Sequence, residues 1–213
     1  FNQLTITSRG LTDGFIVKRL ANGTVAWYIT ISSDSDDSVK SIYENSKEQC
    51  VIVLGSFFFT ASVIVNGVEV KKVIALGEQD MFLARINMVN GSVEWFTTAG
   101  TTTRDAAFGS YLDWSNNRLF FVPSFDARLG DVFINGVSAL NDPAKDIRAA
   151  LLAITLTTGE AIKSLCLKLL SAGLSIAADS TGIFIATSID ESLTFAGKTY
   201  TASGIFDAIL LKY

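Results

Sequence analysis

The opening and closing segments of this chain are copies of one another, and this constrains the fold more than any other feature. FNQLTITSRGLTDGFIVKRL at the start aligns without a gap to FAGKTYTASGIFDAILLKY at the end, so that Asp13 falls on Asp207. Two further copies lie between them, marked by Asp80 and by a degenerate site at Arg148, with intervals of 67, 68 and 59 residues. A chain with such a period folds as a repeat architecture. The other matched positions of the two ends are Phe1 and Phe195, Thr5 and Thr199, Gly10 and Gly204, and Lys18 and Lys212.

Each period carries the signals of four short β-strands. A Trp-containing strand ("VAWYITI" or "VEWFTTA") is followed by a polar loop and a second strand. A strongly apolar strand such as "CVIVLGSFFF" comes next, and a shorter segment then returns to the Asp-X-Phe strand. Short strands with closely spaced turns indicate an all-β fold. A recurring four-stranded unit is typical of a β-propeller blade, which buries its faces against neighbouring blades.

The predicted fold is therefore a β-propeller of four-stranded antiparallel blades, with about three repeats in residues 1–213. The blade periods run over residues 14–80, 81–147 and 148–207, and the two ends share one repeat phase. Since propellers use about four or more blades, we expect a fragment of a larger ring, or a partner that supplies the remaining blades. The alternative is a β-sandwich whose strands are similar by accident.

Several motifs resemble the bacterial-type SBBP β-propeller repeat. "DDSVKSIYENSKEQCVIVLGSFFF" with "DMFLARIN" follows its pattern, and the closest copy is Ser175–Asp179, Gly182, Thr187-Ser188 and Asp207–Lys212. Residues 147–170 depart from that pattern. The resemblance implies a propeller on a secreted or cell-surface protein and implies no common activity. A weaker resemblance, carried by "LLAITLTTGEAI", is to quinoprotein-like propeller blades, without their cofactor residues.

Composition limits the classes of partner. The net charge of −4 argues against nucleic-acid binding, which needs clustered Lys and Arg. The longest apolar runs, such as residues 50–59, fall short of the roughly 20 residues of a spanning helix, so we predict no transmembrane segment. A start at Phe1 without a leader indicates a processed or excised segment. Cys50 and Cys166 lie in apolar runs and are expected to be buried free thiols, with a disulfide as the alternative.

The chain contains no histidine, which removes the Ser-His-Asp and Cys-His nucleophilic systems and His-ligated zinc. We therefore predict no catalytic residue, no cofactor site and no enzyme activity. A glycoside hydrolase that works with two carboxylates is the remaining enzymatic alternative. The turn "NGTVAW" resembles a sialidase Asp-box only superficially, and the arginines are scattered along the chain.

Two features are candidates for ligand binding. The acidic loop "SSDSDDS" carries Asp34, Asp36 and Asp37, whose oxygens suit Ca²⁺; a solvated loop without metal is the alternative, because the counterpart loops lack these acids. Trp27 and Trp95 occupy equivalent repeat positions and are expected between blades. Trp114 lies beside a turn and is therefore the aromatic candidate for stacking on a sugar or another ligand.

The stretches "ANGTVAW" and "VNGSVEW" place Asn22-Gly23 and Asn90-Gly91 at equivalent hairpin turns, which are predicted to be of type I′. "TTGEA" stands at the same place in the third copy, so Gly23, Gly91 and Gly159 share the turn role. Asn22 and Asn90 also head Asn-X-Ser/Thr triplets, which makes them glycan acceptors if the protein follows a eukaryotic secretory route.

These patterns predict a non-catalytic propeller that serves as a structural or protein-interaction module, extracellular or on the cell surface. Its partners are expected to be other protein chains or further blades of the same protein, with glycans as a further class. The apolar insert of residues 56–77 is the predicted assembly edge. The alternatives are a carbohydrate-binding propeller and, less strongly supported, the carboxylate-based glycoside hydrolase.

Overall fold

The computed structural model is an all-β molecule, as the sequence predicts, and its named elements are all strands. No α-helix occurs among the residues that it describes. These are residues 4–129, 131–141, 147–163, 167–169, 173–179, 181–189, 192–195, 198–204 and 207–212.

The antiparallel strands form a row of sheets that follow the repeat. The strand pair β1 (Gly14–Arg19) and β2 (Val25–Ser32), called here the leading sheet, continues through β4 into the hydrogen-bonded sheet of blade A. Blade A contains, in spatial order, β3 (Ser38–Asn45), β4 (Cys50–Val65), β5 (Val68–Asn87) and β6 (Val93–Gly100). Blade B contains β7 (Asp105–Asp113), β8 (Arg118–Leu129), β11 (Ile147–Thr155) and β12 (Leu167–Leu169). Blade C contains β13 (Gly173–Asp179), β14 (Gly182–Ile189) and β17 (Asp207–Lys212).

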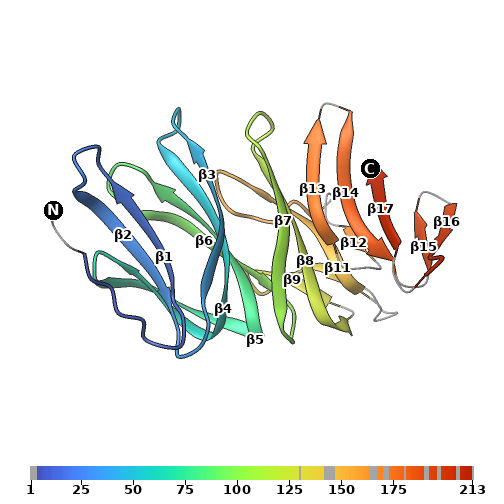
Figure 1. Ribbon diagram of the computed structural model, residues 1–213, viewed down its shortest axis with the longest axis horizontal. Coiled ribbons are helices and arrows are strands. Elements are labelled where there is room, and N and C mark those ends of the chain that lie inside the picture. Colours follow the sequence, from blue (N-terminus) through green and yellow to red (C-terminus); the bar gives the residue numbers. More distant parts are fainter. Residues whose placement is uncertain are drawn as a thin grey trace.

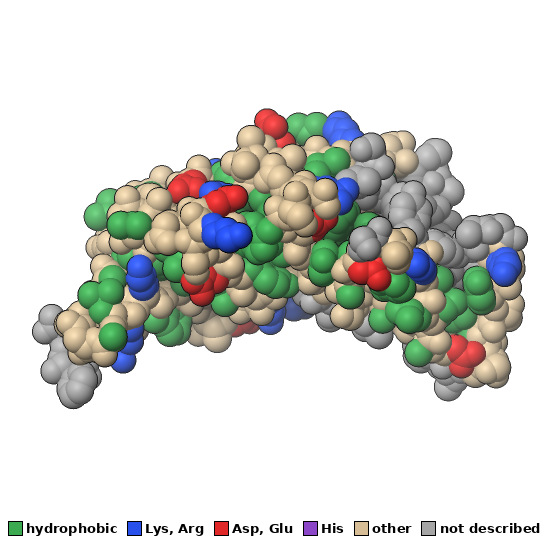
Figure 2. Space-filling model, turned by 90° about the horizontal axis from the view of Figure 1, so that it is seen from above, with side chains coloured by type: hydrophobic (Ala, Val, Ile, Leu, Met, Phe, Trp, Pro, Cys, Tyr) green, Lys and Arg blue, Asp and Glu red, His purple; other side chains and the backbone are tan. Residues whose placement is uncertain are grey.

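The sheets lie side by side in chain order, from the leading sheet near the N-terminus to blade C at the other end (Figure 1). Seen from above, the molecule is a curved arc (Figure 2), and the described residues form no closed ring. The predicted periods begin at residues 14, 81 and 148, within or next to the third strand of each four-stranded unit. The sheets instead begin at β3, β7 and β13, which are the first strands of their units. Repeat and sheet are therefore offset in phase, although they describe the same four-stranded unit.

Alternating side chains along each central strand build the cores between neighbouring sheets. In β4, Val51 and Val53 face the leading sheet, whereas Ile52 and Leu54 face blade B. In β8, Phe121 faces blade A and Phe120 faces blade C. The strands read as continuous apolar runs because both of their faces are buried. Three separate cores result, one at each junction between successive sheets.

Each described blade has an inserted hairpin, which in blades A and B pairs with the sheet before it. The far ends of β4 and β5 extend beyond blade A, and the β4 end pairs with β2 of the leading sheet. In the same way β9 (Asp131–Ile134), in a hairpin with β10 (Val137–Asn141), pairs with β6 of blade A. Blade C has the corresponding hairpin β15 (Ser192–Phe195) and β16 (Lys198–Thr201). In blades A and B the hairpin thereby covers the outer strand of the preceding sheet, which would otherwise be an exposed edge.

The type I′ turns are found at the tips of these hairpins. Asn66-Gly67 and Asn135-Gly136 both have positive φ at the two central residues, as a type I′ turn requires. At the predicted positions Gly23 and Gly91 have positive φ but their asparagines do not. The predicted turn type there is therefore wrong, because the register shifts before each turn add a residue and a single left-handed glycine closes it. The shared role of Gly23, Gly91 and Gly159 as turn residues is confirmed.

Candidate functional site

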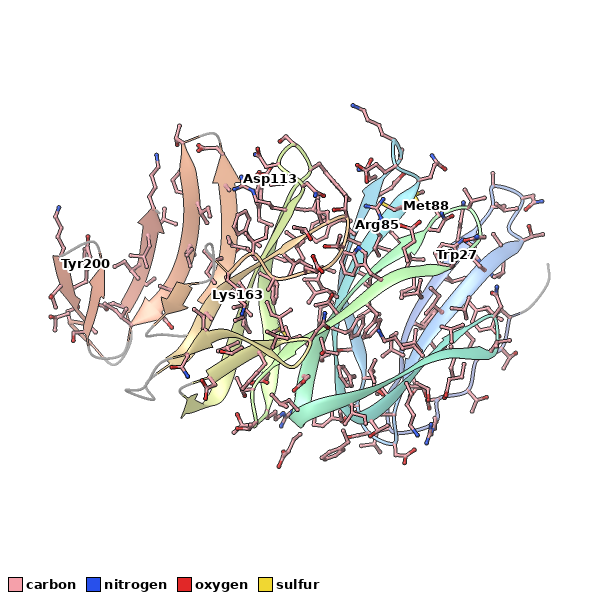
Figure 3. All side chains as sticks on the ribbon, turned by 180° about the vertical axis from the view of Figure 1, so that it is seen from behind. Trp27, Arg85, Met88, Asp113, Lys163 and Tyr200 are labelled. Atoms are coloured by element: carbon pink, nitrogen blue, oxygen red, sulfur yellow. The ribbon has the colours of Figure 1, made fainter. Side chains whose placement is uncertain are left out.

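The junctions between sheets are the most regular polar feature of the molecule. Trp27 on β2 donates its indole N–H to the carbonyl oxygen of Met88 in the β5–β6 turn of blade A (3.0 Å). Trp95 on β6 makes the equivalent bond to the carbonyl oxygen of Leu156 in the β11–β12 connection of blade B (2.9 Å). Figure 3 shows Trp27 beside Met88. Trp27 is 4% exposed and Trp95 is half-buried against the core between blades A and B, so both indoles pack between sheets as predicted.

Each of these carbonyl groups accepts a second hydrogen bond from a cation at the same repeat position. Lys18 Nζ donates to the Met88 carbonyl (2.6 Å), and Arg85 Nη1 donates to the Leu156 carbonyl (3.4 Å). Because Arg85 also forms ion pairs with Glu48 and Glu94, the second junction carries a denser charge network. The indole and the cation together fix one turn of blade A and one turn of blade B against the sheet before it.

The turn glycines make room for the indoles. A Cβ atom on Gly91 would lie 2.7 Å from the Trp27 ring, and one on Gly159 would lie 2.8 Å from the Trp95 ring. Both glycines also have positive φ, which side chains rarely adopt. The sequence identified these glycines and tryptophans as equivalent, but not that they meet across the junction.

The repeated aspartates hold backbone at or directly before the start of strands, except for Asp80, which lies within β5. Asp13, Asp80 and Asp207 each accept a hydrogen bond from the backbone N–H four residues earlier, as do Asp37 and Asp105. Burial raises the pKa of Asp80 to about 6, against two backbone hydrogen bonds that lower it. Burial likewise raises the pKa of Asp37.

Two of these carboxylates lie close together at Gly100. A Cβ atom on Gly100 would lie 2.5 Å from Asp80 Oδ1 and 2.7 Å from Asp105 Oδ2. Asp80 Oδ1 is buried and has no hydrogen-bond partner, and both residues are almost completely buried. A glycoside hydrolase places its carboxylates on either side of a substrate. This pair instead lies within the protein, bonded to its own backbone.

The acidic loop does not gather its carboxylates around one point. Asp34 is exposed and pairs with the guanidinium of Arg9 (2.9 Å). Asp36 accepts a hydrogen bond from Thr12 Oγ1, while Asp37 is buried and binds backbone. Across the described residues, no group of three His, Cys, Asp or Glu side chains is placed to hold a metal ion.

The other predicted residues lie in three settings. Asn22 and Asn90 are exposed at hairpin tips, accessible to a modifying enzyme. Trp114 is half-buried and packs against the core between blades A and B, so only part of its ring is open to a ligand. Cys50 is a buried free thiol, as predicted, and burial raises its pKa. Cys166 lies outside the described residues.

Sequence reasoning missed the asparagines at the tips of the inserted hairpins. Asn66 donates its backbone N–H to the Tyr28 carbonyl and accepts the Tyr28 N–H through its side-chain oxygen. Asn135 makes the same two bonds with Thr98. The shared spelling "VNGV" and "INGV" was the available signal, and it indicates a hairpin but not the strand with which its tip pairs.

The predicted assembly edge, residues 56–77, is partly used within the molecule. Phe57, Ala61, Val63 and Val73 are buried in the core between the leading sheet and blade A. Phe58, Ile64 and Val65 are half-buried, and five other large apolar side chains of this hairpin are exposed, Ile74 most of all at 72%. They are Phe59, Val68, Val70, Ile74 and Leu76.

The surface pockets that described residues line include the following two. One of about 510 Å³ lies on the leading sheet and is lined by Ile6, Phe15 and Val17 among others. The second, of about 440 Å³, lies between the inserted hairpin and β6, where Asn90, Glu94, Trp95 and Phe96 contribute to its wall.

The comparisons with known proteins add little to this geometry. No protein-family model matches the chain, and no curated protein matches it. The SBBP resemblance therefore stays a prediction. A solved structure of quinohemoprotein alcohol dehydrogenase ADHIIG from Pseudomonas putida HK5 is similar with 11% sequence identity and a TM-score of 0.37. The match covers 70% of this chain, which spans about a fifth of that protein's length (21%). None of the described segments is an apolar helix long enough to cross a membrane.

Proposed function

We propose that this chain is a non-catalytic β-propeller module, or part of a larger propeller ring, that acts as a structural or protein-interaction unit in an extracellular or cell-surface assembly. The observation that carries the proposal is the set of exposed apolar side chains on the inserted hairpin, from Phe59 to Leu76. Contiguous apolar surface of several hundred Å² is typical of interaction sites. Figure 2 shows hydrophobic side chains along one face of the arc.

The polar groups support the same function. The buried aspartates bind backbone, and the two indole N–H groups bind carbonyl groups across junctions. These groups stabilise the stack of blades, which leaves apolar surface as the means of recognition. Asn22 and Asn90 are exposed and would carry glycans in a protein that passes through a eukaryotic secretory route.

Site-specific photo-crosslinking in the native assembly tests this function. A photoreactive phenylalanine analogue at Ile74 is expected to capture a discrete protein partner, while the same group at Lys47, exposed in the β3–β4 turn, captures none. Equal capture from both positions, or none from position 74, would contradict the proposal.

Carbohydrate binding is the second candidate, favoured by the 440 Å³ pocket in which Trp95 and Phe96 lie beside Asn90 and Glu94. Aromatic faces next to amide and carboxylate groups suit a sugar, which stacks and hydrogen-bonds at once. A glycan array that binds the wild-type chain, but not a Glu94→Ala variant, would favour this function over the first.

A further inference from the structure

Two buried carboxylates approach the same point at the link between blades A and B. Asp80 lies within β5 of blade A, and Asp105 is the first residue of β7 in blade B. Gly100, the last residue of β6, marks the point, because a Cβ atom there would lie 2.5 Å from Asp80 Oδ1 and 2.7 Å from Asp105 Oδ2. Asp80 is only 3% exposed and Asp105 only 1%. Two acidic groups from different blades are thus held close together and away from water.

The oxygens of the pair are bonded within the fold, with one exception. Asp80 Oδ2 accepts the Leu76 N–H (2.9 Å), and Asp105 accepts the N–H and the hydroxyl of Thr101 (2.6 and 2.7 Å). Asp80 Oδ1, the oxygen nearest to Gly100, is buried and has no hydrogen-bond partner. A buried carboxylate is strongly unfavourable unless an opposite charge or a metal ion compensates it. The unpaired oxygen therefore marks the place of a further group.

No positively charged side chain compensates Asp80. Among the described residues it takes part in no ion pair. Arg104, directly before β7, is directed elsewhere, since its guanidinium donates to Gln79 Oε1 (2.9 Å) and lies over the Phe58 ring. Glu78, the nearest other charged residue along β5, is exposed and of the same sign. The compensating charge has to be bound from solution.

The equivalent place in the first junction shows why the glycine matters. Asp13 pairs with Ser32 across β1 and β2 as Asp80 pairs with Gly100 across β5 and β6, in the same register. Asp13 Oδ1 is also buried without a partner, so the unpaired oxygen recurs in two successive copies. The hydroxyl of Ser32, however, donates to Asp13 Oδ2 (2.7 Å), and its side chain takes the place that stays open beside Gly100. The second copy alone therefore combines an unpaired oxygen with room for a ligand.

We propose that Asp80 and Asp105 together bind one divalent cation beside Gly100, and that Ca²⁺ suits this place. Ca²⁺ takes carboxylate and other oxygens together with water as its ligands, and its charge balances the two carboxylates. The hydroxyl of Thr101, a completely buried residue, is a further oxygen at this place. Because Asp80 belongs to blade A and Asp105 to blade B, the ion ties the two blades where the chain passes from β6 to β7. The site is separate from the acidic loop and goes beyond the proposed interaction function.

Thermal unfolding and calorimetric titration test the site, with CaCl₂ as the only probe. After divalent ions are removed with a chelator, about 5 mM CaCl₂ should raise the melting temperature of the wild-type chain by about 3 °C or more, as binding with the affinity of extracellular modules requires. Calorimetry should show one Ca²⁺ bound per chain. Asp80→Asn keeps an oxygen for the Leu76 N–H but removes a ligand charge, so it should bind Ca²⁺ about tenfold more weakly or worse.

The two conditions also give the variant effects of different sign. In the chelator, where two negative charges lie together, removal of one charge should leave Asp80→Asn at least as stable as the wild type. CaCl₂ should reduce that difference, because it stabilises the wild type and not the variant. A variant with an unrelated folding defect would be less stable under both conditions by the same amount.

Two further variants decide where the ion binds. Gly100→Ala places a Cβ atom against both carboxylates and should abolish the response to Ca²⁺, whatever its melting temperature in the chelator. Asp34→Asn, in the exposed acidic loop, is the matched control and should respond as the wild type does. The proposal is overturned if the wild type does not respond to Ca²⁺, if Asp80→Asn or Gly100→Ala responds fully, or if Asp34→Asn loses the response instead. Each of these results leaves the crosslink at position 74 unaffected, so failure of the site is separate from failure of the proposed function.

Discussion

The first two junctions of the arc and the third are packed alike, but only the first two have a hydrogen bond from an indole across the junction. At the first two, Trp27 and Trp95 donate to a carbonyl group of the next blade and lie against its turn glycine. Four residues after Gly159, where the repeat places this indole, blade B has Lys163, which is exposed (Figure 3). The third junction still has its own apolar core.

This difference separates two contributions to the architecture. Alternation of apolar residues is sufficient to stack one blade on another, because the described residues of the third core are aliphatic side chains together with Phe120 and Tyr111. The indole adds a directional bond and a specific turn contact, which set where the next blade sits. The two contributions can be measured separately by changing one junction at a time.

Removal of Trp27 should give the largest effect. Trp27→Ala leaves a cavity in the first junction and removes one of the two hydrogen bonds to the Met88 carbonyl, and is expected to lower the free energy of unfolding by about 3–5 kcal/mol. Lys163→Ala, at the equivalent position of the third junction, should change it by less than about 0.5 kcal/mol. Urea unfolding followed by circular dichroism measures both. Similar losses in the two variants would mean that the indole position has no special role.

A methyl group on the turn glycine should have a smaller effect. Gly91→Ala places a Cβ atom against the Trp27 ring and forces alanine to φ +76, and should cost about 2–4 kcal/mol. Gly136→Ala is the control, because it has a similar φ of +73 and open space around it, and should cost only about 1–2 kcal/mol. In a Trp27→Ala background the excess cost at Gly91 should vanish, since the two residues are in contact. If the excess persists, the strain lies in the turn itself.

The repeat, the all-β fold and the packing of the indoles could be predicted from sequence, because alternation and turn glycines are local signals. The sequence could not show with which strand of the preceding sheet each inserted hairpin pairs. Their register with β2 and β6 depends on backbone contacts between distant segments, which the apolar pattern does not specify.

The candidate surfaces show the same limit. Phe15 and Phe82 follow their aspartates at the same spacing, yet one is exposed and the other is buried. The difference arises from the neighbouring sheet and not from the local sequence. The acidic loop shows the reverse case, since its three aspartates are close in sequence but have separate partners in space.

The smallest predicted effect concerns Asp80, whose equivalent in blade B is Arg148. The pKa of Asp80 is about 6 in the folded chain, above its ordinary value of 3.8, because the carboxyl is buried. The folded state thus binds this proton more tightly than the unfolded state. Its stabilising effect is complete below pH 3.8 and is lost as the pH rises through about 6.

Asp80→Asn removes this dependence while keeping an oxygen that can accept the Leu76 N–H. The variant should match the wild type near about pH 4 and exceed its free energy of unfolding near about pH 8, by on the order of 2 kcal/mol. Asp113→Asn is the control of opposite sign. Although partial burial opposes it, hydrogen bonds from Asn116, Arg118 and Ser115 lower the pKa of Asp113 to about 2. That variant should lose stability at neutral pH and regain parity with the wild type as the pH falls toward about 2.

The pH series also bears on why blade B carries no aspartate at this position. If Asp80→Asn raises the free energy of unfolding at neutral pH, the buried negative charge of Asp80 destabilises blade A. The charge is then not needed to hold the backbone at Leu76. Loss of the aspartate at residue 148 is then energetically permitted. If the variant is destabilised at every pH, the carboxyl group itself must hold the backbone at Leu76 within β5, and blade B must hold its third strand by a different set of contacts. Urea unfolding across the pH range distinguishes these outcomes, because only the first makes the difference between variant and wild type grow as Asp80 ionises.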